Sequence, residues 1–110
     1  MGTPRRSALS SLPSLLEPGF FKALCDPNRV ALLAWLAVER SAHTVTEIAN
    51  AGCCAVDVSV VSRHLSTLRD AGMVIAEKRG KEVFYHINAM TIVTRLRQIA
   101  DLLESCGMRE

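Results

Sequence analysis

The segment VSVVSRHLSTLRD, residues 58–70, constrains the fold more than any other part of the chain. Val61, Leu65 and Leu68 fall on one face of a helix over these residues, whereas the other faces carry serine, threonine, arginine and histidine. Asp57 stands directly before the segment, at the position where a helix N-cap is expected. The pattern predicts an amphipathic helix whose outer face is small, polar and basic.

A second, shorter helix is predicted just before this one. Thr44 and Glu47 have the spacing of a capping box, in which each side chain accepts a hydrogen bond from the other residue's backbone N–H. This helix ends near Asn50-Ala51-Gly52, and Gly72 ends the longer helix in turn. Two short helices with a tight connection, the second polar and basic on its outside, predict a helix-turn-helix.

Two further helical segments are predicted toward the N-terminus. Asp26 and Pro27 form a typical helix start, and that helix runs to about Glu39. Before it, leucine and phenylalanine recur at roughly helical spacing, but Pro18-Gly19 interrupts the pattern. We therefore expect a packing helix in two pieces there.

A β-hairpin is predicted after the helix-turn-helix. Two runs of alternating apolar and polar residues, 73–78 and 82–87, flank Arg79-Gly80-Lys81. The alternation places Val74 on one face of the first strand and Tyr85 on one face of the second. The segment is therefore a predicted β-hairpin with a basic tip.

The last segment carries a narrow apolar stripe at spacings of four, three, four and three residues. Its members are Ile92, Leu96, Ile99, Leu103 and Cys106. Such a stripe is typical of a seam between two helices, and we expect a second subunit to cover it. The predicted homodimer pairs the terminal helices through Leu16, Phe20, Ile92, Leu96, Ile99 and Leu103.

The composition agrees with one small, mainly α-helical domain that carries a β-hairpin. The chain is 49% hydrophobic but only 5% aromatic, which favours aliphatic helix packing. We expect a flexible arm at residues 1–11 and a winged helix-turn-helix and dimerisation domain at residues 12–110. No apolar run suits a secretory signal or a membrane span, so a cytoplasmic protein without membrane contact is expected. No catalytic constellation or phosphate-binding glycine loop is recognisable, so an enzyme is not expected.

The chain resembles the ArsR/SmtB family of winged-helix repressors over about residues 20–88. The resemblance rests on FKALCDPNRVALLAWL, TVTEIA, VSVVSRHLSTLRDAGMV and KRGKEVFYHIN, which follow the family's usual order. It implies a dimer that binds operator DNA and leaves it when a metal ion, a metalloid or an oxidant reaches a sensing site.

The same resemblance implies a DNA-binding surface. It places Val60, Ser62, Arg63 and His64 toward base edges in the major groove, and the hairpin tip toward the flanking backbone. The chemistry agrees, because an arginine can donate two hydrogen bonds to a guanine and lysines can contact phosphates. The full predicted set is Ser59, Val60, Ser62, Arg63, His64, Thr67, Lys78, Arg79 and Lys81. The alternatives are a merely solvated polar face and, for His64, a structural hydrogen-bonding role.

The cysteines do not match the commoner sensor sites of the resembled family. TVTEIAN holds no Cys-x-Cys pair, TIVTRLRQIADLLES holds no histidine, and Thr67 and Ala71 stand near the end of the recognition helix where a third type of site has cysteines. In a reducing compartment, free thiols are expected rather than disulfides. The chain's own thiols therefore define its candidate sensing site.

A vicinal pair, Cys53 and Cys54, lies in the connection AGCCAVD, which is about two residues longer than usual for the family. The N-terminus of the following helix favours thiolate there. We expect Cys106, or else Cys25, to supply a third sulfur from the same or the other subunit. Such a site suits thiophilic ions such as arsenite, mercury, cadmium or lead. Alone, Cys25 and Cys106 are interpreted as small buried hydrophobic residues.

These observations predict a DNA-binding transcriptional repressor that is released from its operator when a thiophilic metal or metalloid binds cysteine thiolates. One alternative is a repressor of the same fold that senses an oxidant or a reactive sulfur species, and in another the cysteines are purely structural. A third alternative, from a different functional class, is a protein-interaction module whose basic wing does not contact DNA.

Overall fold

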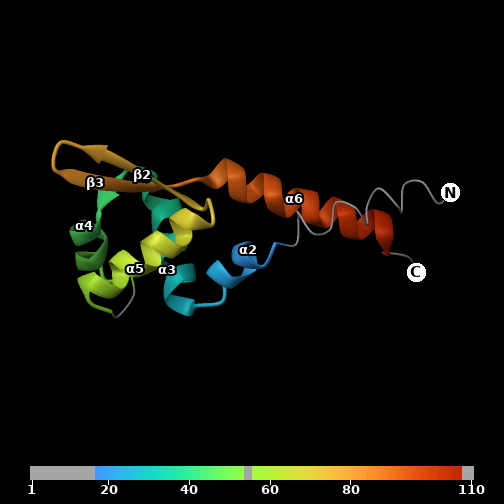
Figure 1. Cartoon of the computed structure of the whole chain (residues 1–110), viewed down its shortest axis with the longest axis horizontal. Helices are drawn as coiled ribbons and strands as arrows, with labels where there is room; N and C mark the ends of the chain where they lie inside the picture. The colour runs from blue at the N-terminus through green and yellow to red at the C-terminus, as the bar shows by residue number, and fades with distance from the viewer. Residues whose placement is uncertain (1–16, 54–55, 108–110) are drawn as a thin grey trace.

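The computed structural model describes residues 17–53 and 56–107, which form five helices and three strands (Figure 1). Their order is α2 (Pro18–Ala23), α3 (Pro27–Glu39), β1 (His43–Thr44), α4 (Val45–Asn50), α5 (Val58–Asp70), β2 (Val74–Arg79), β3 (Glu82–Ile87) and α6 (Ala89–Cys106). The predicted arm at residues 1–11, the predicted interface residue Leu16 and Cys54 lie outside the described residues.

The helix starts follow from local capping. The Asp26 carboxylate accepts a hydrogen bond from the Asn28 N–H at 2.7 Å, and α3 begins at Pro27 as predicted. The capping box of α4 is complete, because the Thr44 N–H donates to Glu47 at 2.9 Å and the Glu47 N–H donates to Thr44 at 3.2 Å. Pro18 is the first residue of α2, so the predicted interruption is where this helix starts.

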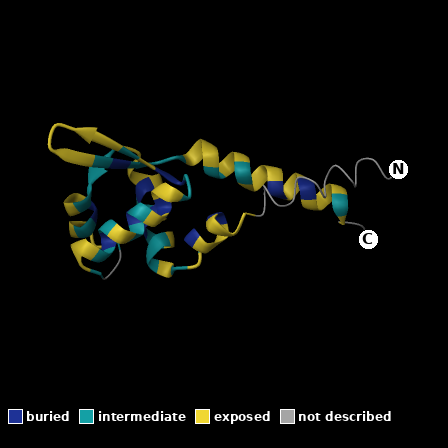
Figure 2. Ribbon diagram, viewed as in Figure 1, coloured by how far each residue is buried: buried dark blue, intermediate teal, exposed yellow. Residues whose placement is uncertain are grey.

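The core lies between α3, α4, α5 and the sheet. Its fully buried large side chains are Phe20, Leu32, Leu36, Ile48, Val61, Leu65, Leu68 and Met73. Figure 2 shows buried positions gathered where these elements face one another, and mostly exposed positions along α6. The predicted apolar face of α5 is confirmed, since all three of its members are 0% exposed.

The sheet has three antiparallel strands in the order β1-β3-β2. The predicted hairpin is confirmed, and β2 pairs with β3 from Val74 opposite Ile87 to Arg79 opposite Glu82. Strand β1, which pairs His43 with Tyr85, was not predicted from the sequence. A strand of two residues is too short to show an alternating pattern.

The junction at the end of α5 sets the direction of the hairpin. Gly72 has a φ of 79°, a conformation that favours glycine, and the Met73 N–H then donates back to the Leu68 carbonyl at 2.9 Å. The Asn88 side chain donates to the Gly72 carbonyl at 3.1 Å. This contact ties the start of α6 to the end of α5, so the hairpin leaves the helix in a defined direction.

Helix α6 extends away from the rest of the described chain (Figure 1) and carries two stripes instead of the one predicted. The inward stripe is buried or half-buried and consists of Ile92, Arg95, Ile99, Leu102 and Cys106. The outward stripe is exposed and consists of Ala89, Val93, Leu96, Ala100 and Leu103. The predicted stripe mixed members of both, because spacings of three and four fit either face of a helix.

Candidate nucleic-acid interface and thiol sites

The outer face of α5 is available at the surface because its inner face is fully packed. Arg63, Ser59 and Thr67 are exposed. The Ser59 hydroxyl donates to the Asp57 carboxylate at 2.9 Å, and the Thr67 hydroxyl donates to the Arg63 carbonyl at 3.2 Å. Arg63 is therefore the charged side chain on this face that is best placed to reach a ligand. The other predicted residues of the helix, Val60, Ser62 and His64, are half-buried.

The hairpin tip presents its three basic side chains to solvent. Arg79 is held in place, since its guanidinium lies 2.8 Å from Glu77 and 4.7 Å from the centre of the Phe84 ring. Within the described ranges, neither Lys78 nor Lys81 takes part in an ion pair. The two lysines therefore offer unneutralised positive charge at the tip of the hairpin.

The electrostatics at the start of α5 favour an ionised cap. The hydroxyl of Ser59 contributes most to lowering the pKa of Asp57, and the Val60 N–H and the charge of Arg63 lower it further. At the start of α3, partial burial acts to raise the pKa of Asp26, but the backbone N–H groups of Asn28 and Arg29 and nearby positive charge, including the Arg29 guanidinium, outweigh it, so that this pKa is lowered. Both helix N-caps therefore stay negatively charged at neutral pH.

His64 contacts an arginine that the sequence analysis missed. The Arg29 Nη1 lies 3.3 Å from the His64 Nδ1, although the two residues are 35 positions apart. Arg29 also donates to the carbonyls of Ala23 at 2.8 Å and Lys22 at 3.0 Å. The structural role considered for His64 is thus present. No sequence signal could have paired these residues, because the contact depends on how α5 packs on α3.

The three cysteines among the described residues lie in different environments. Cys53 is half-buried against the core, and its Sγ donates to the Ile48 carbonyl at 3.9 Å. Cys25 is exposed, which corrects the interpretation of a buried hydrophobic residue, and its Sγ donates to the Phe21 carbonyl at 3.4 Å. Cys106 is half-buried. The connection between α4 and α5 and the far end of α6 lie at opposite ends of the molecule in Figure 1.

The positions of the cysteines decide whether one subunit alone can hold a metal ion. Among the described His, Cys, Asp and Glu residues, no group of three is close enough to hold a metal ion. Cys106 at the end of α6 cannot join Cys53 within one chain, because those two segments are so far apart (Figure 1). If Cys106 is to supply a third sulfur to a site at Cys53, it has to do so from a second subunit.

Five of the six predicted dimer residues lie in the described part of the chain, and they fall into three groups by exposure. Phe20 and Ile99 are only 2% and 8% exposed within their own chain, which leaves little of either side chain for a second subunit. Leu96 and Leu103 are 47% and 51% exposed. The half-buried Ile92 packs against the core of its own chain. The surface available for association is thus the outward stripe of α6.

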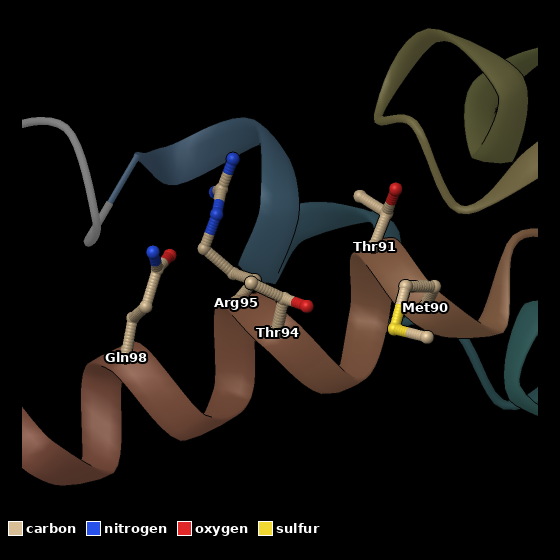
Figure 3. Close-up of a pocket in the computed structure, with 5 residues that line it drawn as sticks. All are labelled: Met90, Thr91, Thr94, Arg95 and Gln98. Carbon is tan, nitrogen blue, oxygen red and sulfur yellow. The ribbon is translucent and has the colours of Figure 1, made fainter.

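A shallow groove of about 270 Å³ lies along another side of α6, lined by Met90, Thr91, Thr94, Arg95 and Gln98 (Figure 3). Arg95 points from α6 toward α2, and its guanidinium lies 5.1 Å from the centre of the Phe20 ring. Arg95 therefore helps to hold α2 against α6.

His43, at the start of β1, is half-buried. Its ring lies 4.8 Å from that of Trp35, and its nitrogens lie 3.8 Å from Glu39 and 3.5 Å from Glu47. These contacts connect the ends of α3 and α4 with the short strand β1.

No helix in the part of the chain that the structure describes is both long and apolar enough to cross a membrane.

The sequence is similar to bacterial regulators of metal resistance. The profile described as "Bacterial regulatory protein, arsR family" matches residues 26–76. The cadmium resistance transcriptional regulatory protein CadC of Listeria innocua is 36% identical over 90 residues, which cover 80% of this chain and 71% of that protein. A probable mercury resistance operon repressor of Streptomyces lividans is 41% identical over 69 residues, which cover 62% of this chain and 51% of that protein.

Solved structures of similar proteins have the same fold. The crystal structure of an ArsR family transcriptional regulator has a TM-score of 0.61 at 28% identity, covering 86% of this chain and 96% of that one. A homodimeric winged helix-turn-helix DNA-binding domain from Mycobacterium bovis has a TM-score of 0.59 at 24% identity, covering 96% and 92%. The latter likeness concerns the fold alone. The family profile, the structural likeness at 28% identity and the 36% identity to CadC over 71% of that protein together show the family. The chain belongs to the arsR family of bacterial regulatory proteins, which are transcriptional regulators and not enzymes.

Proposed function

We propose that the chain is a homodimeric repressor that binds operator DNA through α5 and the hairpin tip. One observation carries this proposal. The inner face of α5 is fully buried, so Arg63 and the outer polar side chains face outward on a rigid helix that is followed directly by the hairpin with the basic tip. A rigid helix with an exposed arginine suits readout of a major groove, and the flanking lysines suit phosphate contacts.

Dimerisation supports the proposal because palindromic operators are read by two helices at once. The outward stripe of α6 leaves Leu96 and Leu103 half exposed on a helix that extends away from the core. Exposed leucines at this spacing favour a second helix as their partner. The Mycobacterium bovis neighbour is named as homodimeric, which supports the association of two subunits.

The proposed inducer is a thiophilic metal or metalloid of the arsenite, mercury, cadmium or lead class. The names of the Listeria and Streptomyces relatives refer to cadmium and mercury resistance. Cys53 lies in the connection between α4 and α5, four residues before the Asp57 cap, and Cys54 is its neighbour in sequence. Cys106 of a second subunit is our candidate for a third sulfur. An ion bound there would act directly on the leading end of α5.

The test is operator binding by the reduced protein, with and without each ion. A duplex from the region upstream of the chain's own coding sequence serves as probe, and random duplex serves as competitor. We expect preferential binding, and release on adding arsenite, mercuric, cadmium or lead ion; coupling of this kind is typically about 1 to 3 kcal/mol. The double variant Cys53→Ser/Cys54→Ser should bind DNA but lose the response.

Separate variants of the two remaining cysteines test which one supplies the third sulfur. Cys106→Ser should weaken the response, whereas Cys25→Ser should leave both DNA binding and release unchanged. A weakened response of Cys25→Ser alone would assign the third sulfur to Cys25. Absence of any preference for the upstream duplex over random DNA contradicts the repressor proposal. Normal release of the Cys53→Ser/Cys54→Ser variant contradicts the sensor assignment alone.

An oxidative switch is the second candidate, and one observation favours it. No three metal-binding side chains lie together among residues 17–53 and 56–107, and a disulfide or persulfide at the vicinal pair needs no third ligand. Peroxide and persulfide titrations of the same complex distinguish the two. Release by an oxidant, reversed by dithiothreitol, with no response to metals supports the oxidative switch.

A further inference from the structure

Arg29 joins three parts of the fold through one side chain. Its Nε and Nη2 donate to the Ala23 and Lys22 carbonyls at the end of α2, at 2.8 and 3.0 Å. Its Nη1 faces α5, where it lies 3.3 Å from the His64 Nδ1. The side chain is only 15% exposed. A planar guanidinium held by two carbonyls points its third nitrogen in a defined direction.

This contact determines which nitrogen of His64 carries the proton. A guanidinium donates hydrogen bonds and cannot accept them, so the His64 Nδ1 must be the acceptor. A neutral imidazole that accepts at Nδ1 has its proton on Nε2. Protonating the ring would turn Nδ1 into a donor that faces another donor and would place two positive charges side by side.

Two charged groups face the ring from the start of α3. One is the Arg29 guanidinium. The other is the Asp26 carboxylate, which lies 3.9 Å from the Arg29 Nη1 and would attract a protonated ring. Only the neutral ring keeps the Arg29 hydrogen bond. The geometry therefore favours one tautomer of His64, with its donor nitrogen on the ring edge away from Arg29.

We propose that Arg29 is a positioning residue for DNA binding, which holds His64 as the Nε2–H tautomer so that this nitrogen donates to an acceptor on the duplex. The proposal rests on the proposed function. It reconciles the two roles considered for His64, since Nδ1 serves the fold and Nε2 serves the ligand. The acceptor is a phosphate oxygen or a base edge, which share the same chemistry.

The first experiment measures the tautomer without DNA. Histidine ring ¹⁵N shifts in the full chain, assigned with His64→Gln, should show His64 as Nε2–H at neutral pH. Arg29→Lys keeps the charge but not the fork, and should convert His64 to a mixture of tautomers. Arg40→Lys is the matched control, because Arg40 is an exposed arginine at the end of α3. A wild-type ring with its proton on Nδ1 overturns the inference whether or not the protein binds DNA.

The second experiment measures affinity for the upstream duplex. Arg29→Lys should weaken binding about tenfold, the scale of one hydrogen bond to a charged or fixed donor, and Arg40→Lys should leave it unchanged. In a His64→Ala background, Arg29→Lys should have no further effect, because the two act as one unit. Equal losses in both backgrounds overturn the proposal, since they indicate a merely structural arginine.

Two conservative variants identify what the histidine supplies. His64→Gln places an amide nitrogen near the position of Nε2 and should retain more affinity than His64→Asn, whose amide lies nearer to Nδ1. A loss on upstream and random duplex alike indicates a phosphate acceptor, and a loss on the upstream duplex alone indicates a base edge. If Arg29→Lys does not fold, the wild-type shifts and this pair still decide the proposal: an affinity for His64→Asn equal to that of His64→Gln overturns it.

The two proposals fail in different ways. Wild-type protein without any duplex preference contradicts the repressor function, and the role of Arg29 in DNA binding is then overturned with it. Wild-type protein that binds its upstream duplex, with unchanged shifts and affinity in Arg29→Lys, contradicts the positioning role alone.

Discussion

Helices α5 and α6 have similar amphipathic patterns but opposite degrees of cover. The apolar face of α5 is 0% exposed at Val61, Leu65 and Leu68, because α3, α4 and the sheet of the same chain enclose it. On α6, Leu96 and Leu103 remain 47% and 51% exposed. The same periodicity thus produces a fully covered apolar face on α5 and, on the outward side of α6, an apolar stripe that stays open.

This difference separates what one chain does alone from what needs a second copy. The face proposed to read DNA is built on α5 and is rigid within a single subunit. The outward stripe of α6, and any thiol site that includes Cys106, are incomplete within the described part of one chain. Substitutions on α5 should therefore act on folding or DNA binding, and substitutions on the outward stripe should act on association.

The largest effect is expected at the outward stripe. Leu96→Asp/Leu103→Asp should raise the dimer dissociation constant about a thousandfold. The two subunits together contribute four half-exposed leucines, and burying them would stabilise the dimer by roughly 4 kcal/mol in all. Sedimentation equilibrium measures this constant, and circular dichroism checks that the helices persist. Val38→Asp is the control, since Val38 is 77% exposed on α3. A dimer unaffected by the double variant would mean that α6 is not the interface.

A smaller effect, on folding, is expected in α5. Leu65→Ala removes a side chain that is 0% exposed and should lower the free energy of unfolding by about 3 kcal/mol through lost burial and a cavity. Urea denaturation followed by circular dichroism measures the change. Val38→Ala should stay within about 0.5 kcal/mol of wild type. If both variants unfold alike, the contrast between a covered and an open face is wrong.

Substitutions on the face of α5 proposed to read DNA should have a smaller effect, on DNA affinity and not on stability. Arg63→Ala should weaken binding to the upstream duplex by about 1 to 3 kcal/mol and relax its sequence preference, because a base-edge contact is lost. Lys81→Ala should weaken all duplexes alike and reduce the slope of log K against log salt by about 1. Fluorescence anisotropy at several salt concentrations separates these outcomes. Identical behaviour of the two variants would argue against groove readout by α5.

The smallest effect is expected at the cap of α5 and depends on pH. The pKa of Asp57 is lowered from its ordinary value of 3.8, mainly by the Ser59 hydroxyl, so its ionised form stabilises the folded chain. That contribution is complete above 3.8 and is lost as the pH falls through the lower pKa of the folded state. Asp57→Asn should therefore unfold with a weaker dependence on pH below 5 than wild type. Equal pH dependence in the two proteins would show that the cap is energetically silent.

Several features follow from the sequence alone because their causes are local. The starts of α3, α4 and α5 depend on Asp26, Thr44 and Asp57, whose side chains bond to backbone groups two or three residues away. The hairpin follows from alternation around Gly80, and the buried face of α5 follows from helical spacing. Each of these signals lies within one segment, so neighbouring residues are sufficient to predict it.

Other features were decided only when distant segments packed together. The contact between Arg29 and His64 spans 35 positions, β1 exists because β3 pairs with it, and the distance of the α4–α5 connection from the far end of α6 follows from the direction in which α6 leaves the core. Periodicity says which residues share a helix face but not which neighbour covers that face. For this chain, the sequence determined the elements and their capping, and the tertiary structure decided which faces were closed, because burial depends on what lies opposite.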